Sequence, residues 1–180
     1  MAVHYINTKE LDKKIHDIKC GDEVYLSGTI YTARDAVHKK LAALMDDKKA
    51  LPIDLNNACI YYAGPTPERE GQVIGSCGPT TSSRMDKFTP LLLEKGLLAM
   101  IGKGPRSKAV VDAIKKRGGI YFCAIGGAGA LCAKAVKKYE VIAFSELGCE
   151  SLKKMEVENF PVICAIDKNG VNIFEKGQEK

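Results

Sequence analysis

Short apolar runs alternate with amphipathic stretches along most of the chain. Residues 23–30 form an apolar run introduced by a turn at 19–22, which predicts a strand, and residues 33–47 repeat apolar side chains at helical spacing, which predicts a helix. The same criteria predict further strands at 58–63, 72–76, 97–101, 120–125 and 141–145, and further helices at 90–95, 107–116 and 128–138.

The C-terminal part of the chain has the turn chemistry of a hairpin. Apolar runs at 162–166 and 171–175 flank the sequence Asp-Lys-Asn-Gly. Alternating strands and helices in the middle predict a partly parallel sheet covered by helices, and the hairpin adds antiparallel pairing, so the predicted class is mixed α/β. With 46% hydrophobic content, residues 1–180 are expected to form a single domain, whose last residues, 176–180, are expected to fray.

Composition narrows the classes of function. The formal net charge is +5, but basic residues are scattered among acidic ones, so neither nucleic acid nor an anionic membrane is an expected partner. No apolar run has the length of a membrane span, and no basic-then-apolar leader opens the chain. Seven cysteines without a Cys-x-x-Cys pair favour reduced, mostly buried thiols. These features predict a cytoplasmic protein.

The stretch from Gly75 to Asp86 is the most informative candidate site, because glycines, hydroxyl side chains and Arg84 crowd the junction of a strand with a loop. Glycines let backbone N–H groups approach an oxyanion, hydroxyls donate further hydrogen bonds, and Arg84 can hold a carboxylate through two parallel bonds. The sequence therefore predicts an anion cradle. The alternative is a hydroxyl-rich turn that caps the following segment.

A second candidate group lies where the first predicted strand meets its helix. Arg34 and His38 are four residues apart and share a helical face, at the end of the sheet where ligands of α/β folds bind. The alternatives are a solvated ion pair of Arg34 with Asp35 and a structural histidine. Lys103 follows a predicted strand and either points into the same pocket or is an exposed turn lysine.

A glycine cluster at 126–129 follows a strand and opens a helix. Glu146 comes near the distance at which an acidic residue meets a ribose in dinucleotide sites. The glycines lack the full Gly-x-Gly-x-x-Gly order, and the unit lies late in the chain. Close backbone packing, or one wall of a pocket, is therefore the favoured interpretation.

Taken together, these stretches resemble the β region of the class I fumarate hydratases and L(+)-tartrate dehydratases, which are iron-sulfur hydro-lyases. The resemblance extends over nearly the whole chain and follows the order of the family. The stretches that carry it are GTIYTARDAVHK at 28–39, GPTTSSRMD at 78–86, GGAGAL at 126–131 and ELGCE at 146–150.

The resemblance implies a swivelling β/β/α domain, which in many prokaryotes is a separate β subunit. It also implies an α subunit whose three cysteines bind a four-iron, four-sulfur (4Fe-4S) cluster, while this chain itself binds no metal. Arg34, Arg84 and Lys103 look like the ligands of the substrate carboxylates, and Thr80 looks like the threonine that moves the proton next to a carboxylate. Such a threonine needs Arg84 or Lys103 close by, because cations stabilise its alkoxide.

The activity that the resemblance implies is reversible hydration of fumarate to (S)-malate, in a heterodimer or larger complex with the α subunit. The isolated chain is expected to be inactive, because it has neither the iron nor a closed cavity. L(+)-tartrate or mesaconate dehydration is an alternative, and so is a non-catalytic anion-binding module. A neighbouring reading frame that encodes three widely spaced cysteines would favour the enzyme over the module.

Overall fold

The structure, a computed structural model, describes residues 1–124 and 129–176. Within these residues, seven strands form one mixed sheet with helices packed against it, which confirms the predicted α/β class. The strands are β1 (Val3–Asn7), β2 (Glu23–Thr32), β3 (Cys59–Tyr61), β4 (Ala99–Gly102), β5 (Ile120–Ala124), β6 (Val136–Ala143) and β7 (Leu152–Ile166).

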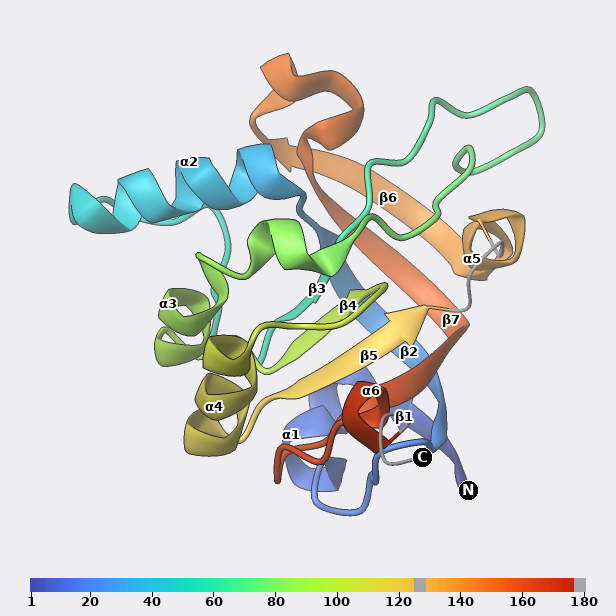
Figure 1. Ribbon diagram of the computed structural model, residues 1–180. Helices are drawn as coiled ribbons and strands as arrows, with labels where there is room; N and C mark the ends of the chain where they lie inside the picture. The colour runs from blue at the N-terminus through green and yellow to red at the C-terminus, as the bar shows by residue number, and fades with distance from the viewer. Residues whose placement is uncertain (125–128, 177–180) are drawn as a thin grey trace.

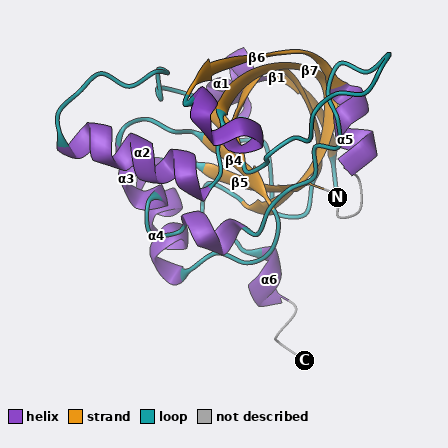
Figure 2. Cartoon of the chain, turned by 90° about the horizontal axis from the view of Figure 1, so that it is seen from above, coloured by secondary structure: helices purple, strands orange, loops and turns teal. Residues whose placement is uncertain are grey.

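The sheet closes on itself, as Figure 2 shows from above. Strands β2, β3, β4 and β5 are parallel neighbours, and β7 runs antiparallel to both β5 and β2. These five strands therefore form a closed barrel, which β1 extends along β2 and β6 extends along β7. Closure is possible because β7 has 15 residues and so is long enough to pair with three strands.

The helices on two flanks of the barrel are the ones that lie near the candidate residues. Figure 1 shows α2, α3 and α4 along one flank and α5 on the other, near β6. Among the described residues, no helix combines the length and the apolar character that a membrane crossing requires. The helices are α1 (Leu11–Lys14), α2 (Asp35–Asp46), α3 (Thr89–Glu94), α4 (Lys108–Arg117), α5 (Gly129–Ala135) and α6 (Ile173–Lys176), with 3-10 turns η1 (Thr8–Glu10), η2 (Ser82–Met85) and η3 (Ser145–Glu150).

Two apolar clusters hold these layers together. Because neighbouring residues of a strand point to opposite faces, Tyr61 packs in the cluster inside the barrel, while Ile60 and Tyr62 pack in the cluster beneath the helices. All three side chains are fully buried. The short strand β3 is thus covered on both faces, as strands of parallel sheets usually are.

Local sequence signals set the ends of some helices and not of others. In α4, the Ser107 side chain accepts a hydrogen bond from the Val110 N–H, and Gly118 ends the helix with φ at 76°. Helix α3, predicted at 90–95, already includes Thr89, whose hydroxyl donates to the Met85 carbonyl and caps no N–H group of the helix.

The strand predicted at 72–76 is wrong. This segment belongs to a long loop that makes its backbone hydrogen bonds internally. The Thr66 N–H donates to the Ser76 carbonyl at 3.0 Å, and the Gly75 N–H donates to the Thr66 carbonyl at 3.1 Å. These backbone groups are therefore not available to a sheet neighbour.

The helix predicted at 128–138 is too long. Helix α5 ends at Ala135, and the strand predicted at 141–145 begins earlier, at Val136. Residues 136–143 pair with β7 in an antiparallel ladder. A partner distant in sequence thus decides their conformation, because strand preference depends on the neighbours that a strand finds.

The predicted C-terminal hairpin is also wrong. Strand β7 covers Leu152–Ile166, of which the sequence predicted only the last five residues, and β1 was not predicted. After its turn the chain makes a single bridge, from Ile166 to Asn172, and then enters α6. The Asn172 side chain accepts a hydrogen bond from the Phe174 N–H, which favours a helix start. Of residues 176–180, which were predicted to fray, 177–180 lie outside the described residues.

Candidate functional site

Three parallel strands end at the same edge of the barrel. Because β2, β3 and β4 are adjacent and parallel, the segments that leave their carboxyl ends lie side by side, where ligands of α/β folds usually bind. Arg34 follows β2, Gly64 follows β3 and Lys103 follows β4. Figure 1 shows the turn η2 and the start of α2 close to these strand ends.

The Arg34 side chain is held at one edge. It crosses Gly64 so closely that a Cβ there would lie 3.1 Å from the Arg34 Cδ. Its Nε lies 2.9 Å from a carboxylate oxygen of Glu150, as an ion contact without straight hydrogen-bond geometry, and 3.8 Å from one of Asp35. Its Nη atoms have no hydrogen-bond partner among the described residues. The guanidinium thus keeps the N–H groups of both Nη nitrogens for an anion.

His38 supports the backbone of Arg34. The Arg34 carbonyl accepts hydrogen bonds from the His38 N–H at 3.0 Å and from the ring Nδ1 at 2.8 Å, so Nδ1 carries the proton. Burial lowers the pKa of the His38 imidazole to about 4, which keeps the ring neutral. The ring packs edge-on against Tyr62, with centroids 5.4 Å apart. Of the two interpretations left open by the sequence, this geometry favours the structural histidine.

The loop that carries Thr80 is attached to the ends of β3 and β4. The Thr80 N–H donates to the Tyr62 carbonyl at 2.7 Å, and Thr81 forms a parallel bridge with Lys103. The Ser82 N–H donates to the Lys103 carbonyl, and the Ser82 Oγ accepts from the Lys103 N–H, both at 3.0 Å. Thr80 and Lys103 therefore lie on adjacent backbone segments, and the proximity of the lysine ammonium to the Thr80 hydroxyl stays a prediction.

Ser82 fits against β4 because residue 102 is a glycine. A Cβ on Gly102 would overlap the Ser82 Oγ and would lie 2.8 Å from the Tyr62 ring. The Tyr121 hydroxyl lies 2.8 Å from both the Ser82 Oγ and the Gly104 carbonyl. Since a carbonyl only accepts, Tyr121 donates to Gly104 and accepts the Ser82 proton. The buried Ser82 is thus fully hydrogen-bonded and fixes the loop.

Arg84 and Lys103 are both exposed, and neither forms an ion pair with the described residues. Arg84 lies in the turn η2. The structure therefore brings Arg34, Thr80 and Lys103 onto neighbouring segments, while Arg84 extends from the next turn along the chain.

A second arginine, which the sequence analysis did not single out, is buried beneath η2. The Arg106 Nε lies 2.7 Å from the Asp86 Oδ1, and the guanidinium lies over the rings of Tyr62 and Tyr121. Because Asp86 directly follows η2, this contact anchors the turn that carries Arg84. The only sequence signal was a Gly-Pro-Arg tripeptide after a strand, which is typical of an ordinary turn.

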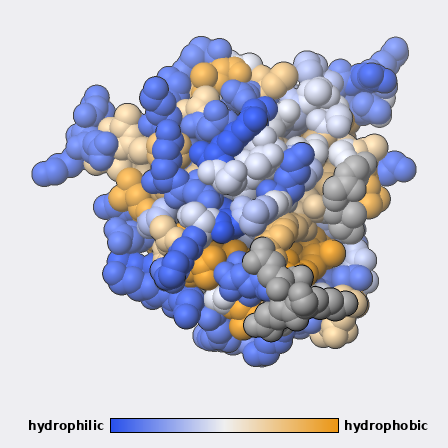
Figure 3. Space-filling view, viewed as in Figure 1, coloured by the Kyte–Doolittle hydropathy of each residue, from blue (hydrophilic) through white to orange (hydrophobic). Residues whose placement is uncertain are grey.

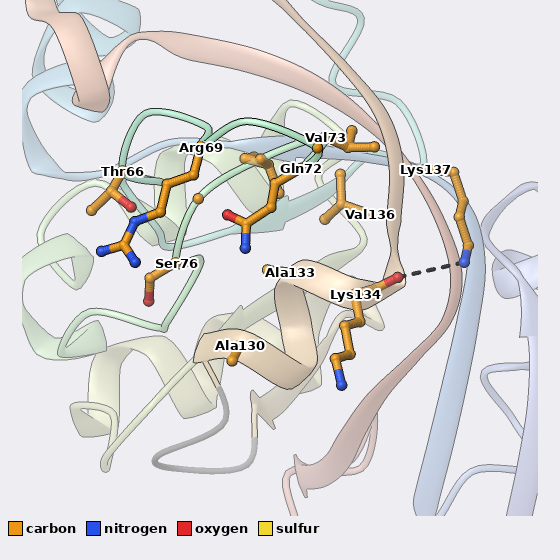
Figure 4. Close-up of a pocket in the computed structure, with 13 residues that line it drawn as sticks. Thr66, Arg69, Gln72, Val73, Ser76, Ala130, Ala133, Lys134, Val136 and Lys137 are labelled. Carbon is orange, nitrogen blue, oxygen red and sulfur yellow. Dashed lines mark hydrogen bonds between the residues drawn. The ribbon is translucent and has the colours of Figure 1, made fainter.

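A pocket of about 610 Å³ lies beside this site, between the loop at 66–76 and helix α5 (Figure 4). Arg69 lines it from the loop, and Lys134 and Lys137 line it from the opposite wall, so the pocket is positively charged. None of the four predicted site residues lines it. The pocket therefore overlaps the predicted anion cradle only at Gly75 and Ser76 and lies beside the rest of it.

The face of the molecule around the site is mainly hydrophilic. Figure 3 shows hydrophilic and near-neutral residues over the ends of β3 and β4, and hydrophobic residues gathered below them, over β5. Near the pocket, two large apolar side chains are exposed, Val73 at 47% and Leu131 at 50%. Exposed apolar groups next to a polar site are typical of a surface that meets a partner.

The glycine cluster packs against the cradle. The Cys77 N–H donates to the Gly129 carbonyl at 3.2 Å, and a Cβ on Gly129 would lie 2.6 Å from the Ser76 Oγ. This agrees with the close backbone packing expected from the sequence, although 126–128 lie outside the described residues. Glu146 forms an ion pair with Lys40 at 2.9 Å.

The part of the chain that the structure describes offers no group of three His, Cys, Asp or Glu side chains that could hold a metal ion. Among the described residues no cysteine forms a disulfide, and burial raises the pKa of the Cys59 and Cys77 thiols to about 12. A raised pKa disfavours the thiolate that a cluster needs. These residues do not fit an iron-sulfur centre, and a cluster on a partner stays a prediction.

Comparisons of the chain with known proteins show the family to which it belongs. The family model described as Fumarase C-terminus matches residues 2–177. The chain is 43% identical over 158 residues to Fumarate hydratase 2 of Leishmania major, an alignment that covers 87% of this chain and 28% of that protein. It is 40% identical over 172 residues to the aerobic class I fumarate hydratase of Escherichia coli strain K12, with coverages of 94% and 31%.

A third relative has a similar length. It is named "Putative L(+)-tartrate dehydratase subunit beta", comes from Methanocaldococcus jannaschii and is 38% identical over 184 residues, which cover 99% of this chain and 94% of that protein. The chain thus spans less than a third of the two fumarate hydratases and nearly all of this subunit. Because the family model matches almost every residue, the chain belongs to the Fumarase C-terminus family.

Proposed function

We propose that this chain is the β subunit of a class I fumarate hydratase, and that it hydrates fumarate reversibly to (S)-malate together with an α subunit. In this proposal residues 1–180 act as one unit that binds the carboxylates of the substrate. The observation that carries it is the convergence of Arg34, Thr80 and Lys103 at the carboxyl edge of β2, β3 and β4. The family relationship supplies the class of reaction.

A dicarboxylate substrate explains why the candidate site contains several cationic side chains. Fumarate carries two negative charges, which cations bind in the ground state and the transition state alike. Proton removal from malate adds charge to one carboxylate, so a positive group fixed at that carboxylate stabilises the transition state more than the substrate. The Arg34 side chain is held along its Nε edge, and hydrogen bonds to Ser82 fix the backbone from which the Lys103 side chain extends. Arg84 lies on an exposed turn and provides a planar fork for a carboxylate that the partner helps to enclose.

Thr80 is the proposed proton-transfer residue. A threonine hydroxyl is a poor base unless a neighbouring cation stabilises its alkoxide. The bridge between Thr81 and Lys103 supports the assignment, because it brings the lysine backbone next to this segment.

The proposed partner is an α subunit with a four-iron, four-sulfur cluster, which supplies Lewis-acid chemistry at the substrate hydroxyl and one carboxylate. The β chain binds the rest of the dicarboxylate, moves the proton at Thr80 and, with the partner, excludes water. We propose that the complex is cytoplasmic, since four of the cysteines, Cys59, Cys77, Cys132 and Cys164, are buried thiols, as is usual in a reducing compartment.

Reconstitution tests the proposal. The chain is co-expressed anaerobically with an α chain that has three widely spaced cysteines, and fumarate hydration is measured. Arg84→Lys should weaken transition-state binding by roughly 2 to 4 kcal/mol, because lysine offers a point charge in place of a fork. Thr80→Ala should lower kcat about a hundredfold or more, with a smaller change in KM.

Ser83→Ala is the matched control, because it removes an exposed hydroxyl of the same loop. Parental rates for Arg84→Lys and Thr80→Ala, both folded and paired with a cluster-loaded partner, would reject the site and favour the hydroxyl-rich turn. Failure of the two chains to form either a complex or an active enzyme would reject the β-subunit assignment and favour an anion-binding module.

L(+)-tartrate dehydration is the second candidate. It is favoured by the relative from Methanocaldococcus jannaschii, whose name carries that activity and whose length this chain nearly matches. The same reconstituted complex is assayed with fumarate, mesaconate and L-tartrate. The substrate with the highest kcat/KM decides between them.

A further inference from the structure

Arg34 is already in contact with a carboxylate of its own chain. The Glu150 Oε1 lies 2.9 Å from the Arg34 Nε, at the end of the turn η3. The two side chains are 27% and 33% exposed, so this pair is better shielded from water than a surface ion pair. The contact uses the Nε edge and leaves the Nη atoms without hydrogen-bond partners among the described residues.

The turn that carries Glu150 needs support from outside. Phe144 has φ 58° and ψ 43°, in the left-handed region, and Gly148 has φ 58° and ψ −121°, which only glycine adopts readily. Such a backbone persists only when surrounding contacts hold it. The position of the Glu150 carboxylate therefore depends on what holds the turn.

Lys153 holds the turn. Its Nζ lies 2.9 Å from the Cys149 carbonyl and 2.7 Å from the Ser151 Oγ. The carbonyls of Gly148 and Ser151 lie at 3.3 and 3.4 Å. Because residues 149 and 151 flank Glu150, the ammonium fixes the backbone on both sides of it. Lys153 is only 5% exposed and forms no ion pair within the described residues. Hydrogen bonds to these oxygens therefore offset the free-energy cost of burying its ammonium.

Strand pairing holds Lys153 in turn. It lies on β7 as the register partner of Thr32 on β2, two residues before Arg34. A series of contacts therefore runs from β2 through Lys153 to the turn at Glu150, and from Glu150 to Arg34 just after β2. Because this series starts on a barrel strand, it is rigid enough to set the direction of the Arg34 side chain.

We propose that Glu150 and Lys153 are positioning residues for Arg34, which hold its Nε edge so that the two Nη atoms meet a substrate carboxylate end-on. This inference rests on the proposed function. The competing idea is that Glu150 occupies Arg34 in place of the substrate. The two ideas predict opposite changes in KM, since loss of a positioning residue raises KM and loss of a competitor lowers it.

Kinetics of the reconstituted complex provide the first test. Glu150→Ala and Lys153→Met should each raise KM for fumarate roughly tenfold, with kcat within about threefold of the parent, because ground-state and transition-state binding suffer together. Glu150→Gln should restore most of the loss, since its amide oxygen can still lie against the Arg34 Nε edge. The Glu150→Ala/Lys153→Met double variant should resemble the single variants, because the two residues act in series.

Two control variants match these changes. Lys154→Met alters the next residue of β7, whose side chain points to the opposite face, and Glu146→Gln alters the same turn at its pair with Lys40. Both should keep the parental KM. If Lys153→Met fails to fold, Glu150→Ala and its rescue by Glu150→Gln carry the test.

Solvent exchange of the Arg34 Nε proton, measured by NMR in the isolated chain, provides a test without activity. Glu150→Ala and Lys153→Met should accelerate it, and Lys154→Met and Glu146→Gln should not. Unchanged exchange, an unchanged or lower KM in Glu150→Ala, or multiplied effects in the double variant would overturn the inference. An inactive parental complex would reject the proposed function, while the exchange rates would still decide whether Glu150 and Lys153 hold Arg34.

Discussion

The Nε of Arg106 lies 2.7 Å from the Oδ1 of Asp86, and no part of the Arg106 side chain is exposed. The Arg106 Nη2 donates to the Thr89 Oγ1 at 2.7 Å, and the other oxygen of Asp86 accepts from the Ser107 N–H at 2.7 Å. Thr89 begins α3 and Ser107 caps α4. A single buried ion pair therefore joins η2 and two helices.

Removal of the Arg106 guanidinium should strongly destabilise the folded chain. We expect Arg106→Met to lower the free energy of unfolding by about 3 to 5 kcal/mol, because it leaves the Asp86 carboxylate without its buried partner. Arg117→Met is the control: Arg117 pairs with Glu94 at 3.6 Å, and both side chains are exposed, so the expected loss is below about 1 kcal/mol. Urea unfolding measures both. Equal losses would contradict the role of Arg106.

His38 should make stability fall as the pH falls. Burial lowers its pKa to about 4 in the folded chain, against an ordinary value of 6.5. Between pH 6.5 and 4 the unfolded chain therefore binds a proton that the folded chain does not, and the folded state loses roughly 3 kcal/mol over this window. His38→Phe keeps an aromatic ring against Tyr62 and should remove this part of the slope. An unchanged slope in urea unfolding from pH 7.5 to 4.5 would show that another group causes it.

Gly102→Ala should loosen the cradle. The added methyl group would overlap the Ser82 Oγ, and overpacking of this kind costs about 1 to 3 kcal/mol. The Lys103 N–H, which donates to that oxygen, should lose protection from hydrogen exchange. Gly78→Ala is the stability control, because a Cβ there meets only the Gly129 Cα, at 3.8 Å. A protected Lys103 amide in Gly102→Ala would mean that Ser82 can move without releasing the loop.

Leu131→Asp should weaken association with the α subunit. Leu131 is 50% exposed on α5, next to the proposed site, where a charge would be buried by a docked partner. We expect at least about a tenfold weaker association by sedimentation, with unchanged thermal stability of the isolated chain. Val3→Asp, at a 55% exposed apolar residue of β1, is the control and should associate normally. Normal association of Leu131→Asp would move the interface elsewhere.

The sequence by itself determined the elements whose signals lie close together in the chain. Ser107 and Gly118 mark the two ends of α4, and the strand that leads to Arg34 is followed by its helix. A local hydrogen bond or a glycine in the left-handed region acts within a few residues, so such signals are visible without the fold. The resemblance to iron-sulfur hydro-lyases, which rests on short stretches in a fixed order, added Thr80 as a candidate and gave Arg34, Arg84 and Lys103 their expected role as carboxylate ligands.

Only the tertiary structure decided features that depend on distant segments. The barrel closes because β7 finds β2, more than a hundred residues earlier, and β6 is a strand because it pairs with β7. Arg106 and Lys153 look like ordinary surface cations in the sequence, but each is buried against oxygens from another part of the fold. A charged side chain tolerates burial only where partners surround it, and the positions of those partners are set by the folding of the whole chain.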